Sequence, residues 1–67
     1  MKTTIKEMKK GDFFTLKDYG EYPDDSKVYI RGEYNKSLKK YEIYKYNDVN
    51  AFRYVAGNKE VITGFTF

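Results

Sequence analysis

The chain contains no cysteine, no histidine and no tryptophan, and it has only one proline among its 67 residues. Without cysteine it can form neither a disulfide nor a thiolate-bound zinc site. Without histidine it lacks the side chain that most often acts as a general base near neutral pH and that most often binds transition metals. We therefore expect a protein that is not an enzyme and that holds no metal and no cofactor.

Long apolar runs are missing as well. No uncharged run approaches the ~18–20 apolar residues that cross a membrane, and the first residues lack the apolar centre of a signal peptide. We expect a cytoplasmic protein that does not engage a membrane. The five glycines are scattered, so the sequence also lacks the glycine-rich loop that cradles phosphate groups in nucleotide-binding proteins.

Aromatic residues, in contrast, are plentiful, with eight tyrosines and five phenylalanines. A chain this short buries only about 60% of the surface that it exposes when unfolded, so its core must be small. Each large ring can bury roughly 150–250 Å², and tyrosine can keep its hydroxyl in water while doing so. We expect a single domain over residues 1–67 whose core depends on these rings.

Short runs of β-branched and aromatic residues, bounded by Gly, Asn, Asp and Pro, predict an all-β protein. The strands that we predict are 12–17, 27–34, 41–48 and two within 51–67. An acidic loop over 18–26 follows the first strand, and a two-residue turn at Gly57-Asn58 joins the last two. Five strands with one long loop favour a small SH3-like barrel, with an OB-like barrel or a curled antiparallel meander as alternatives.

The residues before the first predicted strand are read as a polar lead-in. Ile5 and Met8 are three positions apart, so residues 4–9 form one helical turn packed under the sheet in the alternative interpretation.

The charges are unevenly distributed, although the net charge is only +3. Residues 1–17 carry +3, residues 18–26 carry −4 and residues 27–46 carry +4. The spacing of the acids in 18–26 does not match a calcium-binding loop, and we interpret them as a solvated surface. Segregation of this kind can give the protein a basic face even when its total charge is small.

The most unusual stretch is VYIRGEYNKSLKKYEIYKY, residues 28–46, which we interpret as a hairpin with Tyr34 opposite Tyr41. Alternation assigns to the core Val28, Ile30, Tyr34, Tyr41 and Ile43. It leaves on one outer face Tyr29, Arg31, Tyr44 and Tyr46. Further cations follow at the hairpin tip and on the next strand, namely Lys36, Lys39, Lys40 and Arg53. Glu33 facing Glu42, and an inward Lys45, indicate a bulge near Gly32 or Lys45.

Aromatic and basic side chains on one face are typical of nucleic-acid binding, because bases stack on rings for roughly 1–3 kcal/mol each and cations neutralise phosphates. We therefore expect a non-catalytic binding module for single-stranded or structured nucleic acid. The alternative is a module that binds or inhibits a host protein through the same Tyr-rich face. A free sheet edge leaves a monomer and a weak homodimer both open.

The segments KKGDFFTLK, VYIRGEYNKSLKKYEIYKYNDVN and EVITGFTF resemble a family of small proteins of bacteria, phages and mobile elements. The resemblance covers most of the chain. It implies an origin in a prophage or conjugative element and assigns no catalytic or binding residue.

Overall fold

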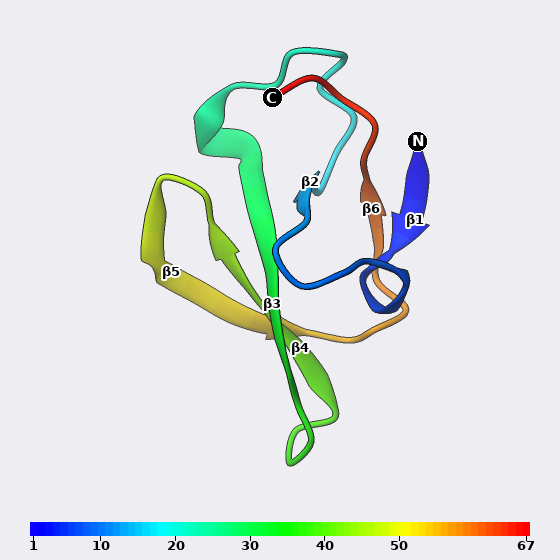
Figure 1. Cartoon of the computed structure of the whole chain (residues 1–67), viewed down its shortest axis with the longest axis vertical. Coiled ribbons are helices and arrows are strands. Elements are labelled where there is room, and N and C mark those ends of the chain that lie inside the picture. The colour runs from blue at the N-terminus through cyan, green and yellow to red at the C-terminus, as the bar shows by residue number, and fades with distance from the viewer.

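The computed structural model describes all residues from Met1 to Phe67 as one antiparallel sheet of six strands with two short 3-10 turns (Figure 1). The strands are β1 (Lys2–Thr4), β2 (Phe13–Thr15), β3 (Val28–Asn35), β4 (Lys40–Lys45), β5 (Asp48–Val55) and β6 (Glu60–Ile62), and the turns are η1 (Ile5–Glu7) and η2 (Asp25–Lys27). Their order across the sheet is β1-β6-β2-β3-β4-β5. The all-β prediction is confirmed, but the strands number six rather than five and the sheet is not closed into a barrel.

The N-terminal segment forms the helical turn that was the alternative interpretation. Ile5 lies in η1 and is fully buried, and Met8, which caps it, is buried beside it. The backbone N–H of Ile5 donates to the carbonyl of Lys59 at 3.1 Å, and that of Lys6 donates to the carbonyl of Gly57 at 2.9 Å. The turn therefore covers one end of the core and hydrogen-bonds to two carbonyls of the connection between β5 and β6.

The turn predicted at Gly57-Asn58 is present, because the N–H of Lys59 donates to the carbonyl of Ala56 at 3.1 Å, but the hairpin that it was expected to form is wrong. β5 pairs only with β4, whereas β6 pairs with β1 and β2. The hydrogen bonds from η1 take the carbonyls of Gly57 and Lys59, so the chain leaves β5 and crosses to the other side of the sheet before β6 begins. The local turn forms, but the pairing of both chain ends places β6 between β1 and β2 rather than beside β5.

The main core cluster lies on one face of the sheet, and the buried pair Thr15 and Val28 lies on the other. The buried members of the cluster are Ile5, Met8, Phe14, Ile43 and Val61, and the partly buried Leu16, Tyr29, Tyr41 and Val55 pack around them. The loop between β2 and β3 runs along the outside, and all of residues 18–26 except the buried Pro23 are exposed. Its Glu21 carbonyl accepts a hydrogen bond of 2.7 Å from the N–H of Thr66, so the loop and the C-terminal segment lie together (Figure 1).

A bulge in β3 sets the register of the hairpin. Tyr34 faces Tyr41, as predicted, but the pairing shifts between Arg31 and Tyr34. A Cβ on Gly32 would lie 2.9 Å from the Glu42 carboxylate oxygen, so glycine is the residue that this position accommodates. The bulge near Gly32 is thus confirmed.

Because of the bulge, the pairing of the first part of β3 with β4 differs from the regular pairing expected from Tyr34 opposite Tyr41. Beyond the bulge Arg31 faces Ile43 rather than Tyr44, and Tyr29 faces Lys45 rather than Tyr46. Tyr34, which was assigned to the core, is 44% exposed.

β5 forms the outer edge of the sheet and is irregular. Tyr44 faces Phe52 but the next residue, Lys45, faces Asp48, so Val49, Asn50 and Ala51 bulge out without partners on β4. Residues 48–53 are all exposed.

Candidate functional site

The bulge divides the predicted Tyr/Arg strip between two faces of the sheet. Tyr29 is a register partner of Phe14, and Arg31 is one of Ile43, which places both on the core face. Tyr44 and Tyr46 lie on the opposite face. The prediction that these four side chains share one outer face is therefore wrong, because one extra residue in β3 reverses the direction of every side chain before it.

Tyr29 supports an arginine instead of offering a free ring. One side of its ring stacks on Phe14, with the ring centres 5.8 Å apart and the planes 22° from parallel. The guanidinium of Arg53 on β5 lies over the ring, 5.8 Å from its centre. Because both ring faces are occupied, Tyr29 cannot stack on a base unless Arg53 moves.

Arg31 is held in the same manner. Its guanidinium lies 4.4 Å from the centre of the Tyr41 ring, and its Nη1 donates to the carbonyl of Gly32 at 2.9 Å. The Nε of Arg31 is buried and has no hydrogen-bond partner. The arginine is half-buried and forms no ion pair, although its charge attracts the nearby carboxylate of Glu33.

The single ion pair of the structure lies elsewhere, between the exposed side chains of Lys10 and Glu33. Their hydrogen bond, and secondarily their Coulomb attraction, raises the pKa of Lys10 above its ordinary value and lowers the pKa of Glu33 below its own. Every other lysine and arginine is free of a carboxylate partner.

Two depressions lie along β5. The larger, of about 410 Å³, is lined by Lys40, Arg53, Tyr54, Val55, Ala56, Asn58 and Lys59. The smaller, of about 210 Å³, is lined by Tyr29, Lys45, Ala51, Phe52 and Arg53. Arg53 lines both, and neither contains a carboxylate. We call the four cations Lys40, Lys45, Arg53 and Lys59 the β5 margin.

The hairpin tip adjoins the β5 margin through Lys40. The β3–β4 hairpin extends past the rest of the sheet (Figure 1), and its tip carries Lys36, Lys39 and Lys40, all exposed. The tip has a defined shape, because the Oδ1 of Asn35 accepts a hydrogen bond of 3.0 Å from the N–H of Leu38 and Lys39 adopts a φ of 55°. The structure thus brings together Lys40 and Arg53 of the predicted residues, with Lys36 and Lys39 next to them.

The opposite side of the sheet is aromatic. Phe13, Ile30, Tyr44 and Phe52 are register partners across β2, β3, β4 and β5. Tyr46 and Phe67 extend this row by packing edge-to-face on Phe13, with ring centres 5.8 and 5.2 Å away. We call the six side chains Phe13, Ile30, Tyr44, Tyr46, Phe52 and Phe67 the aromatic face.

Sequence reasoning missed the contribution of Phe13, Phe52 and Phe67 to this surface. Phe13 and Phe14 are consecutive strand residues, so one of them had to face outward, and this was the available signal. Phe67, the last residue of the sequence, is 47% exposed.

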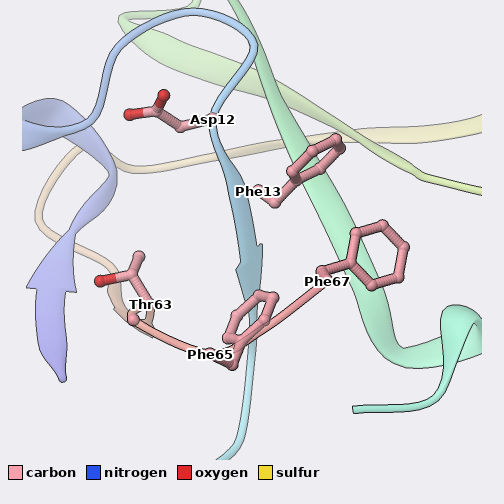
Figure 2. A pocket seen from close by; sticks show the side chains of 6 residues that line it. Asp12, Phe13, Thr63, Phe65 and Phe67 are labelled. Carbon is pink, nitrogen blue, oxygen red and sulfur yellow. The ribbon is translucent and has the colours of Figure 1, made fainter. Parts of the chain in front are cut away.

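A third depression, of about 280 Å³, opens at one end of the aromatic face between β2 and residues 63–67. Its lining residues are Asp12, Phe13, Thr63, Gly64, Phe65 and Phe67. Figure 2 shows the rings of Phe13 and Phe67 together on one side of β2, while the carboxylate of Asp12 points away from them. That carboxylate accepts a hydrogen bond of 2.9 Å from the N–H of Lys9 and so shapes the preceding turn.

Comparison of the chain with protein-family models, with curated proteins and with solved structures gives no match. Neither of its helical turns has the length or the apolar character that crossing a membrane requires. The arrangement of side chains is therefore what the functional argument rests on.

Proposed function

We propose that the protein is a non-catalytic module that binds nucleic acid, single-stranded or structured, through the β5 margin and the hairpin tip. The observation that carries this proposal is the set of cations along β5, which line two depressions without any carboxylate. These four cations are the β5 margin. Two further lysines, Lys36 and Lys39, lie at the hairpin tip next to it. Cations that lack partners within the protein are available to phosphate groups.

The two arginines are suited to phosphate binding because they are already oriented. Arg53 rests on Tyr29 and Arg31 rests on Tyr41, so part of the entropy of fixing a long side chain is lost on folding rather than on binding. In this proposal Tyr29 positions Arg53 and does not stack on a base. Tyr44 and Tyr46, on the opposite face, take no part in phosphate binding.

The aromatic face supports a second candidate function, the binding of a protein partner. Four of its side chains are between 41% and 53% exposed, namely Phe13, Tyr46, Phe52 and Phe67. Exposed aromatic side chains that form a continuous row are typical of protein interfaces. This surface would serve a host protein, as an addition to the basic side or in its place.

The proposal extends to the fold and the origin of the chain. β2 to β5 form a meander, and β6 returns to pair with β2, which is how a small SH3-like barrel begins to close. We propose that the sheet is an open form of such a barrel with β1 added at its edge. The resemblance to proteins of phages and mobile elements supports a role in the maintenance of such an element.

Salt dependence tests the nucleic-acid proposal directly. Fluorescence anisotropy with a labelled 20-nucleotide single strand and its duplex, at 50 and 200 mM salt, measures the affinity. If the protein contacts about four phosphates, its affinity for whichever oligonucleotide it binds should fall on the order of 100-fold between 50 and 200 mM salt. Lys40→Ala combined with Lys59→Ala should weaken binding and flatten the salt dependence.

The matched control removes two exposed lysines far from β5 in the sheet order, Lys2→Ala with Lys17→Ala. This variant loses the same charge and should retain most of the affinity. Absence of binding to either oligonucleotide at 50 mM salt would contradict the proposal, and equal losses in both variants would show that only net charge matters.

A further inference from the structure

We propose that the hairpin tip enters the minor groove of a nucleic-acid duplex, where Leu38 packs against a base step. This inference rests on the proposed nucleic-acid binding and names the form of nucleic acid that the site prefers. Lys36, Lys39 and Lys40 would bind the phosphates on either side of the groove. The β5 margin, which Lys40 joins to the tip, would contact the backbone next to it.

The tip combines one apolar side chain with a set of cations. Leu38 is 51% exposed at the end of the hairpin that extends past the sheet (Figure 1). No acid lies between residues 34 and 41, and Glu33 at the base of the hairpin is paired with Lys10. An apolar residue surrounded by lysines complements a groove whose walls are anionic and whose floor is formed by base edges.

The tip is also held in shape before any ligand arrives. Asn35 fixes the turn through its hydrogen bond to the Leu38 N–H, and the rings of Tyr34 and Tyr41 pack 4.7 Å apart across the base of the hairpin. The guanidinium of Arg31 lies over the Tyr41 ring, 4.4 Å from its centre. A preformed tip loses little conformational entropy on insertion.

A duplex explains these features better than a single strand does. Two rings on the basic side, Tyr29 and Tyr41, are covered by Arg53 and Arg31 and are not free to stack on unpaired bases. Strands of some DNA-binding proteins lie in the minor groove, and apolar wedges that enter it unstack base steps and bend the duplex. Leu38 is the exposed apolar side chain placed to act as such a wedge.

The experiment uses the complete chain and a 20-base-pair duplex labelled with a donor and an acceptor dye at its two ends. Energy transfer reports bending, and anisotropy on the same sample reports affinity. The wild type should bind the duplex more tightly than the matching single strand and should increase the energy transfer. Leu38→Ser should abolish the increase and weaken duplex binding about tenfold, which corresponds to about 1.4 kcal/mol, because the apolar contact with the base step is lost.

Two controls make the result specific. Leu38→Met keeps an apolar side chain and should retain bending, and Tyr22→Ser removes a 75% exposed apolar residue from the acidic loop and should change nothing. The minor-groove ligand netropsin should compete with the wild type. Circular dichroism of each variant establishes that the fold is retained.

The possible outcomes separate this inference from the proposed function. Duplex binding without bending, equal bending by Leu38→Ser, insensitivity to netropsin, or a preference for the single strand would each overturn the wedge and leave nucleic-acid binding intact. Absence of binding to both forms would overturn the two together.

Discussion

The β5 margin and the aromatic face are built from neighbouring residues of the same strands, yet they differ in nearly every property. Arg53 of the margin and Phe52 of the aromatic face are consecutive in β5, and Lys45 and Tyr44 are consecutive in β4. Alternation sends each kind of side chain to its own side of the sheet. A thin sheet can thereby present a cationic surface and an apolar surface that two different partners could use independently.

The comparison depends on the bulge at Gly32. With regular pairing, Arg31 would lie beside Tyr44 and the two surfaces would be mixed. The bulge places Arg31 with the other arginine and Tyr44 with the other exposed rings. A one-residue change in register is therefore what separates charge from aromatic surface in this protein.

The largest effect should come from Gly32→Val, which would break this separation. The new side chain meets the Glu42 carboxylate at 2.9 Å and the Glu42 carbonyl at 3.1 Å, so we expect a loss of about 1–3 kcal/mol in the free energy of unfolding in urea. Adding Glu42→Ala should recover part of the loss because it removes the contact with the carboxylate and leaves those with the Glu42 carbonyl and the Tyr44 ring. A Gly32→Val variant with wild-type stability and wild-type cross-strand NMR contacts would show that the bulge does not need glycine.

Tyr29→Leu should come next, because it removes the support of Arg53 without touching a charge. We expect about 1 kcal/mol lower stability from the lost stacking on Phe14, and about fivefold weaker nucleic-acid binding, as befits an interaction of roughly 0.5–1 kcal/mol. Tyr29→Phe keeps the ring and should keep both properties. If Tyr29→Phe weakens binding as much as Tyr29→Leu, the hydroxyl and not the ring matters.

Tyr46→Ala tests the independence of the two surfaces. The Tyr46 ring packs on Phe13 and Phe67, with centres 5.8 and 4.6 Å away, so its loss should cost about 1 kcal/mol of stability. Nucleic-acid affinity, measured by anisotropy, should remain within about twofold of the wild type, which is the scatter expected for a residue outside the site. A larger loss of affinity in a folded variant would join the two surfaces into one site.

The smallest effect should come from the Lys10–Glu33 ion pair. Because the pKa of Glu33 is lowered on folding, its contribution to stability is present above the ordinary pKa of a glutamate and is lost as pH falls through the lowered value. Because the pKa of Lys10 is raised, the contribution is lost again as pH rises through that raised value. Glu33→Gln should therefore be slightly less stable than the wild type in the neutral range and equally stable in acid.

Both side chains of this pair are exposed, so the difference should be small and should shrink in high salt. Urea titrations at several pH values measure it. Glu60→Gln, at an exposed position without an ion pair, is the control and should show no such pH dependence.

The sequence predicts the local features of this fold well and its long-range pairing poorly. The Tyr34–Tyr41 register and the bulge near Gly32 follow from side-chain patterns within about a dozen residues, whereas the helical turn with Ile5 and Met8 was only the alternative to a polar lead-in. The position of β6 between β1 and β2 depends on segments far apart in the sequence, and the turn at Gly57, although present, does not pair β5 with β6. Local residue preferences do not indicate which of several distant strands β6 will pair with.

The candidate site was predictable in its residue types but not in its arrangement. Lys40 and Arg53 were identified as basic binding residues, and they line one depression. Tyr29 and Arg31 were expected to point outward, and the extra residue of the bulge turned them inward. The contacts of Tyr29 with Arg53 and of Tyr41 with Arg31 could not be predicted from the sequence, because these side chains lie on different strands and meet only in the folded chain.

The irregularity of β5 has a consequence for how the protein behaves at high concentration. An unbroken outer strand of eight residues would offer a neighbouring copy a continuous row of backbone donors and acceptors on which to grow. The unpaired Val49, Asn50 and Ala51 bend that row and leave a straight segment only from Phe52 to Val55. The same departure from regular pairing that shapes the smaller depression thus makes β5 a poorer template for a strand of another copy.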